Sequence, residues 1–134
     1  MAQLVQLAYV SSAITAFTEE QLNSLLLIAR KANREHNITG LLLYKDGNFM
    51  QLIEGEERKI VQLYANIGRD ERHTGIILLF KEPAPQRDFP DWFMGFRNLA
   101  SENVEGFTDF LSPNAEDKLV HGKAKTFFSI FKKS

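Results

Sequence analysis

Three polar side chains occupy positions where the apolar pattern of the sequence calls for hydrophobic ones. Tyr9 ends the apolar stretch QLVQLAY (3–9), Gln51 lies inside FMQLIEG (49–55), and Asn33 continues a helical stripe of leucines and alanines. A buried polar group without a partner costs roughly 1–3 kcal/mol. A phenol and two amides that converge on one apolar layer therefore predict hydrogen bonds among themselves or a planar guest that forms hydrogen bonds.

These residue types could move a proton. The phenol of Tyr9 has an ordinary pKa of about 10, so at physiological pH it is neutral and has a proton to give. The amide of Gln51 carries donors at one end and an acceptor at the other, so it could relay that proton. Two simpler interpretations stay open: a structural Tyr9–Gln51 hydrogen bond, and an Asn33 that only ends its helix, although Asn37 suits that role better.

The composition excludes several other kinds of chemistry. The chain has 134 residues, enough for one domain, and a formal net charge of −1, which favours neither nucleic acid nor an acidic membrane surface. It has no cysteine, and its three histidines are far apart, so we expect no disulfide and no metal site. Without a signal-like N-terminus or an apolar run near the roughly 20 residues that cross a bilayer, a cytoplasmic protein is expected.

Hydrophobic periodicity predicts the elements that must position the three polar groups. TEEQ (18–21) has the pattern of a capping box that opens a helix, and KDGN (45–48) is typical of a β-hairpin turn. A second helix is expected from residue 56. Alternating or continuous apolar runs predict five strands, at residues 3–9, 38–44, 49–55, 75–81 and 91–96.

This order of elements predicts an α+β protein of the ferredoxin-like βαββαββ type, with a mixed five-stranded sheet and two helices on one face. We expect the first and third strands to be parallel central neighbours, so that Tyr9 and Gln51 meet beneath the helices. Residues 100–134 carry a one-sided aromatic stripe and predict a C-terminal helical extension. It would pack on the outer face of the sheet, where Ala8 and Met50 are too apolar to face water.

Six stretches, in order and at suitable intervals, resemble the BLUF family of blue-light sensors using FAD. They are YVSSA from Tyr9, AxxxN ending at Asn33, ITGLLLY from Ile38, FMQLIEG from Phe49, DERH from Asp70 and RDFPDWFMGF from Arg87. The resemblance implies a flavin-binding domain at residues 1–99, of the short single-domain type, with a flavin ring between the helices. FAD is the cofactor that it implies, and FMN would share the ring site.

The resemblance also implies roles for the polar residues. Asn33 would hydrogen-bond the flavin ring, and Tyr9 would donate an electron and then a proton to the excited flavin. Gln51 would relay this proton and return rotated, or as its tautomer, with a different hydrogen bond to the ring. The ring would stay chemically unchanged, and its absorption would shift slightly to the red.

Five further residues are implicated in the same way. Asp70, Arg72 and His73, in DERH, match residues that flank the cofactor, although His73 could instead cap the second helix. Trp92 and Met94 match the last-strand pair associated with passing the signal outward, although an apolar pair of this kind more often belongs to the core.

The chain departs from some family members on the ribityl and phosphate side of the site. Ala29 and Ala32 stand where those members carry polar residues. Arg30 could compensate for them, or it could be a solvated helix charge.

We therefore expect a light sensor with no catalytic turnover and no fused output domain, which signals through a homo-oligomer or a separate effector protein. Two alternative functions remain. An acylphosphatase-like enzyme would need an arginine and a glycine-rich turn near the first strand, and YVSSAITAFTEEQ (9–21) has neither. A flavin-free interaction module would have no reason to keep Tyr9, Asn33 and Gln51 together.

Overall fold

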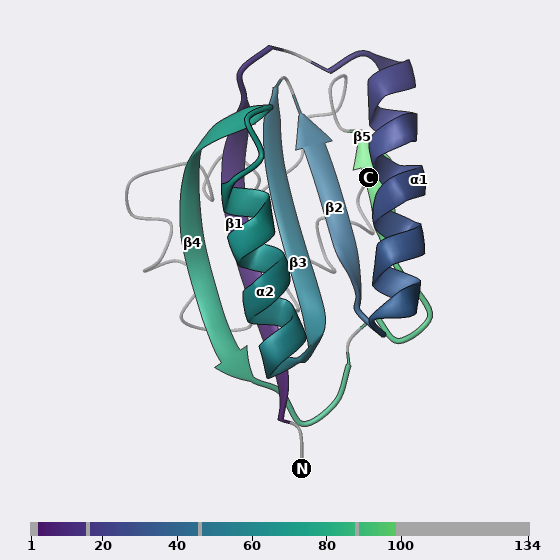
Figure 1. Ribbon diagram of the computed structural model, residues 1–134, viewed down its shortest axis with the longest axis vertical. Helices are drawn as coiled ribbons and strands as arrows, with labels where there is room; N and C mark the ends of the chain where they lie inside the picture. Colours follow the sequence, from purple (N-terminus) through teal and green to yellow (C-terminus); the bar gives the residue numbers. More distant parts are fainter. Residues whose placement is uncertain (1–2, 16, 46, 88, 99–134) are drawn as a thin grey trace.

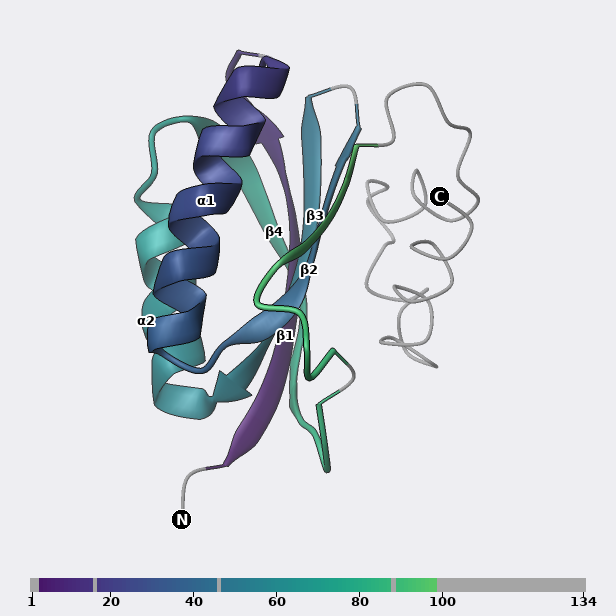
Figure 2. The same ribbon diagram turned by 90° about the vertical axis from the view of Figure 1, so that its right-hand side faces the viewer.

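The computed structural model describes residues 3–15, 17–45, 47–87 and 89–98. They form one β-sheet with two helices on one of its faces, as two perpendicular views show (Figures 1 and 2). The expected extension at residues 100–134 lies outside the described residues. The elements are β1 (Leu4–Ala13), α1 (Glu19–Glu35), β2 (Thr39–Lys45), β3 (Asn48–Glu56), α2 (Glu57–Gly68), β4 (His73–Pro83) and β5 (Gly95–Asn98).

The sheet has the strand order β4-β1-β3-β2-β5, which confirms the predicted ferredoxin-like arrangement. It is mixed, because β2 pairs parallel with β5 while β1, β3 and β4 pair antiparallel. The expected parallel pairing of the first and third strands is wrong: β1 and β3 run antiparallel. A tight hairpin makes β3 run opposite to β2, and the α1 crossover makes β2 run in the direction of β1.

Helix α1 begins and ends as its sequence predicts. The Thr18 hydroxyl accepts a hydrogen bond from the backbone N–H of Gln21 at 3.1 Å, and the Gln21 side chain accepts one from the Thr18 N–H at 2.9 Å. At the other end, Asn37 adopts a φ of +56°, a left-handed conformation that asparagine tolerates well and that stops the helix. Asn33 is therefore not needed as a terminator, and it points inward with 2% of its surface exposed.

Two apolar clusters sandwich the sheet. Alternation along β1 and β3 sends Leu7 and Ile53 toward the helices, into a cluster that also contains Leu26 of α1. The opposite face buries Ala8 and Met50 completely, as its apolar composition predicts. No helix within the described part of the chain is long and apolar enough to cross a lipid bilayer.

The fifth strand is shorter than predicted and begins at Gly95. Pro90, which has no N–H for a strand ladder, lies in a turn closed by a 3.1 Å hydrogen bond from the Trp92 N–H to the Phe89 carbonyl. Trp92 and Met94 therefore do not alternate along one face of a strand. Trp92 packs on the outer cluster, stacked on Phe89 with ring centroids 5.3 Å apart, whereas Met94 lies in the cluster beneath the helices.

Candidate functional site

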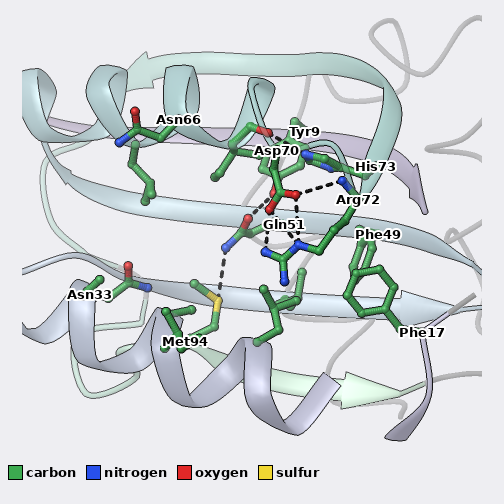
Figure 3. Close-up of a pocket in the computed structure, with 17 residues that line it drawn as sticks. Tyr9, Phe17, Asn33, Phe49, Gln51, Asn66, Asp70, Arg72, His73 and Met94 are labelled. Atoms are coloured by element: carbon green, nitrogen blue, oxygen red, sulfur yellow. Dashed lines mark hydrogen bonds and ion pairs between the residues drawn. The ribbon is translucent and has the colours of Figure 1, made fainter. Parts of the chain in front are cut away.

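A cavity of about 270 Å³ lies between α1, α2 and the sheet (Figure 3). This is slightly below the roughly 300–1,000 Å³ usual for small-molecule sites. Its apolar walls include Leu25, Ile28, Leu42, Leu63 and Ile67. Its polar lining residues are Tyr9, Asn33, Gln51, Asn66, Asp70, Arg72 and His73. An apolar slot with a few convergent polar groups is the usual form of a site for a planar organic ligand.

Tyr9 and Gln51 form the centre of the cavity floor. They are direct cross-strand partners on β1 and β3, so their side chains project from the same face. The Tyr9 hydroxyl donates a hydrogen bond to Gln51 Oε1, and both residues are buried. The other end of the amide, Nε2, donates to the sulfur of Met94 at 3.4 Å. The predicted phenol–amide contact is thus confirmed, and the amide is held at both ends.

The environment keeps the phenol protonated. Burial raises the pKa of Tyr9 well above its usual value of 10, with smaller contributions from Tyr64 and Asp70. The ring of Tyr64 on α2 lies 5.7 Å from that of Tyr9, centroid to centroid. Tyr9 therefore holds its proton throughout the physiological pH range, in a hydrogen bond to a neutral amide.

Asn33 joins the cavity to the chain segment that precedes β5. Its Nδ2 donates a hydrogen bond to the Phe93 carbonyl at 2.7 Å. Its Oδ1 accepts no hydrogen bond from the described residues, and the residue lines the cavity. An acceptor is therefore available to a ligand that carries an N–H.

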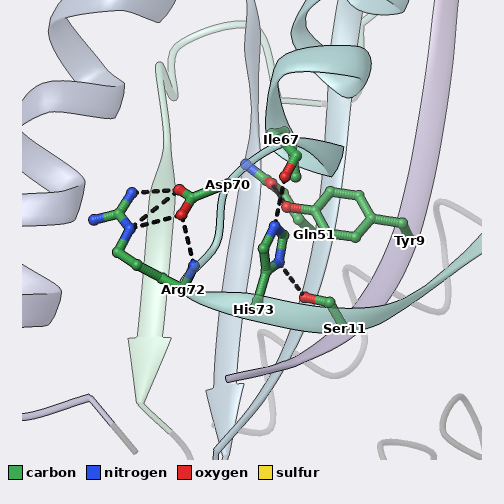
Figure 4. A network of polar contacts seen from close by, with 7 residues as sticks. All are labelled: Tyr9, Ser11, Gln51, Ile67, Asp70, Arg72 and His73. Carbon is green, nitrogen blue, oxygen red and sulfur yellow. Dashed lines mark hydrogen bonds and ion pairs between the residues drawn. The ribbon is translucent and has the colours of Figure 1, made fainter. Parts of the chain in front are cut away.

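Asp70 and Arg72 form an ion pair beside the cavity (Figure 4). The Arg72 guanidinium donates to both carboxylate oxygens of Asp70, with Nη2 at 2.5 Å from Oδ2 and Nε at 2.9 Å from Oδ1. These hydrogen bonds lower the pKa of Asp70 from 3.8 to about 2. The guanidinium also lies 5.9 Å from the ring centre of Phe17, which places a cation at the aromatic end of the cavity.

Both ring nitrogens of His73 are engaged (Figure 4). Nε2 lies 2.6 Å from the Ile67 carbonyl and Nδ1 lies 2.9 Å from the Ser11 hydroxyl. A carbonyl only accepts, so Nε2 carries a hydrogen, and in the neutral ring Nδ1 accepts from Ser11. His73 thus ties the last turn of α2 to β1, which is the capping role weighed from the sequence. Its part in cofactor binding stays a prediction.

Two predicted residues lie away from the cavity lining. Arg30 is exposed on α1 and its Nε donates to the Met94 carbonyl at 2.9 Å. Trp92 lies with the outer cluster, on the other side of the sheet from Gln51. The cavity brings together the seven remaining predicted residues, Tyr9, Asn33, Gln51, Asp70, Arg72, His73 and Met94.

Among the lining residues that sequence reasoning missed, Phe17 and Asn66 each carried a usable signal. Phe17 immediately precedes the helix cap, a position where an apolar residue commonly packs back onto its helix. Here its ring meets Phe49 edge-on, with centroids 5.3 Å apart. Asn66 lies three residues after Leu63 on α2, so it shares that face. Its Oδ1 accepts hydrogen bonds from Gln62 and Arg69, which leaves its amide N–H groups as donors.

The fold and this cavity define a small α+β domain with a cavity beneath its helices that suits a planar ligand. The family model for sensors of blue-light using FAD (BLUF) matches residues 4–95, and the chain belongs to this family. BLUF domains are light sensors rather than enzymes, and they bind a flavin.

Relatives and solved structures agree with this assignment. The chain is 34% identical over 128 residues to a photoactivated adenylate cyclase subunit alpha-like protein of Euglena gracilis, covering 96% of this chain but 12% of that protein. It is 34% identical over 70 residues to the blue light- and temperature-regulated antirepressor BluF of Escherichia coli K12, covering 52% and 17%. The chain thus spans a small part of the length of these relatives.

Among solved structures, the dark state of BlrB, a BLUF protein, superposes with a TM-score of 0.75 at 28% identity, covering 99% of this chain and 98% of that one. The ground state of BlsA gives a TM-score of 0.74 at 27% identity, covering 96% and 86%. Each of these two superpositions covers most of both chains.

The residues present fit a flavin ring. Its flat faces require apolar walls, which Ile28 and Leu63 supply from the two helices. Its polar edge carries donors and acceptors, which the free Oδ1 of Asn33 and the N–H groups of Asn66 can match. The small side chains of Ala29 and Ala32 in the lining leave room on the α1 side.

Proposed function

We propose that this chain is a blue-light photoreceptor whose switch is the hydrogen-bonded pair Tyr9–Gln51. The observation that carries the proposal is the contact itself: a buried phenol donates to a buried amide on the floor of a cavity that fits a flavin. The phenol can give up an electron and a proton, and the amide can accept that proton and reorient.

We propose that the cofactor is FAD, in keeping with the description of the family. Asn33 would accept from the ring, Asn66 would donate, and Arg72 would place its positive charge beside the ring or its tail. When bound, the flavin supplies the absorption of blue light and, once excited, the capacity to take up an electron. Asp70 orients Arg72, because its carboxylate holds the guanidinium through three hydrogen bonds.

The proton step follows from the geometry of the pair. Loss of an electron makes the Tyr9 phenol strongly acidic, so its proton moves along the existing hydrogen bond from Oη to Gln51 Oε1. The protonated amide would then give up a proton from Nε2 to a bound flavin that had taken up the Tyr9 electron, which balances the charge, and Gln51 would return rotated or as its tautomer. Rotation breaks the contact of Oε1 with Tyr9, which the proton transfer has already altered, and the Nε2 hydrogen bond to the Met94 sulfur, which is weak because a thioether is a weak acceptor. The hydrogen bond with Tyr9 therefore positions the amide, and the weak bond to Met94 opposes its rotation only slightly.

We propose that the signal leaves through Met94 and Trp92 to a separate effector protein or to a second copy of the chain, in the cytoplasm. Met94 contacts the amide, and Trp92 lies two residues away on the other side of the sheet. Movement of the Gln51 amide would thus displace Met94 and, through it, Trp92 on the other side of the sheet, where a partner protein could bind. The relatives named as a cyclase and an antirepressor show that this domain accompanies different outputs.

Absorption spectroscopy tests the proposal. The purified protein should be yellow, shift slightly to the red under blue light, and recover in darkness. Tyr9→Phe should stay yellow and lose the shift, because the phenol that gives the proton is gone. Tyr64→Phe is the matched control: it removes a hydroxyl from the neighbouring ring and should keep the shift. Colourless protein that takes up no added flavin would refute the proposal, and so would a normal photocycle in Tyr9→Phe.

A further inference from the structure

A buried carboxylate on the outer face of the sheet has no part in the photochemical pair. Glu54 of β3 is 0% exposed. Its Oε1 accepts from the Phe89 backbone N–H at 2.7 Å and from the Thr39 hydroxyl at 2.9 Å, and its Oε2 accepts from Gln6 Nε2 at 3.0 Å. A buried carboxylate is costly unless donors surround it. These donors satisfy it, and one of them belongs to the segment that leads to Met94.

That segment, Phe89–Met94, is here called the strap. Arg87, just before it, adds to the same attachment: its Nη1 donates to Thr39 Oγ1 at 2.8 Å and to the Glu54 carbonyl at 3.0 Å. Inside the strap, the Trp92 carbonyl accepts from the Gly40 N–H at 2.8 Å. The first part of the strap is thus fastened to the adjoining ends of β2 and β3.

The last part of the strap reaches the cavity. The Phe93 carbonyl accepts from Asn33 and the Met94 carbonyl accepts from Arg30, both on α1. The Met94 sulfur accepts from Gln51 Nε2. The strap therefore crosses from the Glu54 attachment on one face to the photochemical amide on the other. Because it is only six residues long, a shift at Phe89 would alter the position of Met94.

We propose that Glu54 is a positioning residue for the switch: by fixing Phe89 it holds the Met94 sulfur against the Gln51 amide. It thereby sets the rate at which the amide returns to its dark arrangement. This inference rests on the proposed function. It assigns Glu54 no contact with the flavin and no share in the proton transfer.

The first test uses Trp92, the single tryptophan of the chain, as a reporter of the strap. In the full chain as purified, kept in darkness, Glu54→Ala and Arg87→Met should increase the quenching of Trp92 fluorescence by acrylamide, because the stacked Phe89–Trp92 unit loses its anchor. Glu54→Gln should behave as wild type. Its amide oxygen still accepts from Phe89, and the Gln6 amide can turn to match its N–H group.

Glu57→Gln is the matched control. It removes a carboxylate three residues away that pairs with Lys81 at the surface, and it should change nothing in either test. If Glu54→Ala does not fold, Arg87→Met decides the outcome, because Arg87 is not fully buried. Unchanged quenching in the variants that fold would overturn the inference.

The second test uses the photocycle. Glu54→Ala should change the dark-recovery rate by about threefold or more, the size expected from loss of one hydrogen bond. The change should have the same direction as that of Met94→Ala, and adding Glu54→Ala to Met94→Ala should change the rate no further. Equal effects with and without Met94 would contradict the proposed route. A wild-type chain without a photocycle would refute the proposed function instead, and the quenching test would still decide whether Glu54 holds the strap.

Discussion

Two polar side chains of β3, Gln51 and Glu54, lie three residues apart on opposite faces of the sheet, and they are held very differently. Glu54 receives hydrogen bonds from nitrogen and oxygen donors of Gln6, Thr39 and Phe89. Gln51 has one strong partner, Tyr9, and one weak partner, the Met94 sulfur. A saturated polar group is an anchor, whereas a weakly held one can turn. One strand thus presents a firmly held group outward and, in the function we propose, a movable group toward the cavity.

The largest effect is expected when the movable group is removed. Gln51→Leu should abolish the light-induced shift completely, because leucine can neither accept the Tyr9 proton nor reorient a hydrogen bond. Difference spectroscopy on the flavin-loaded protein checks this. Gln86→Leu, at an exposed position, is the control and should keep the full shift. A residual red shift in Gln51→Leu would show that Gln51 is not the switch.

Removal of the anchor should act on stability. Glu54→Ala leaves three buried donors without their acceptor, so the free energy of unfolding should fall by about 3–5 kcal/mol. Urea unfolding of wild type and variant measures the difference. Glu57→Gln should stay within about 0.5 kcal/mol of wild type, as surface changes usually do. A loss below about 1 kcal/mol in Glu54→Ala would mean that water or a rearranged strap replaces the carboxylate easily.

A smaller effect is expected from the weak partner of the amide. Met94→Leu keeps the volume of the side chain but removes the sulfur acceptor, so stability should change by less than about 1.5 kcal/mol. The dark-recovery rate should nevertheless change about two- to fivefold, because the Gln51 N–H loses a weak hydrogen bond of about 0.5–1 kcal/mol. Stopped-illumination kinetics measure this rate. An unchanged rate would indicate that Met94 serves only as packing.

The smallest effect concerns the ion pair at the end of the cavity. The folded pKa of Asp70, about 2, lies below its ordinary value of 3.8, so the stability that Asp70 contributes is present above about pH 4 and is lost as pH falls toward 2. Asp70→Asn should therefore show a shallower loss of stability between pH 4 and 2 than wild type. Thermal unfolding at several pH values checks this. Identical slopes would show that the Arg72 pair contributes nothing measurable.

Much of the site could be predicted because alternation along a strand determines which side chains share a face. Tyr9 and Gln51 were predicted to meet, and they do so although the predicted direction of their strands was wrong. Side-chain period is a property of one strand, whereas strand direction depends on how hairpins and crossovers connect the sheet. The apolar pattern therefore predicts the Tyr9–Gln51 contact but not the relative direction of β1 and β3.

The residues that were placed wrongly or missed depend on irregular backbone. Trp92 and Met94 read as a strand pair, but the turn at Pro90 delays β5 and sends the two side chains to opposite faces. Arg30 donates a hydrogen bond to the Met94 carbonyl in the same irregular segment and does not line the cavity. Glu54, inside an apolar motif, gave no sign of its donors, because these come from residues distant in sequence.

The two-ended amide of Asn33 has a consequence for regulation. Its Nδ2 donates a hydrogen bond to the Phe93 carbonyl, and its Oδ1 can accept one from a ligand in the cavity. Binding equilibria that share such an element are reciprocal: whatever alters one must alter the other by the same factor. A partner protein whose binding displaces the Phe93 carbonyl should therefore lower the affinity of the chain for flavin. The flavin affinity measured in darkness with and without that partner would give the coupling between the two binding events.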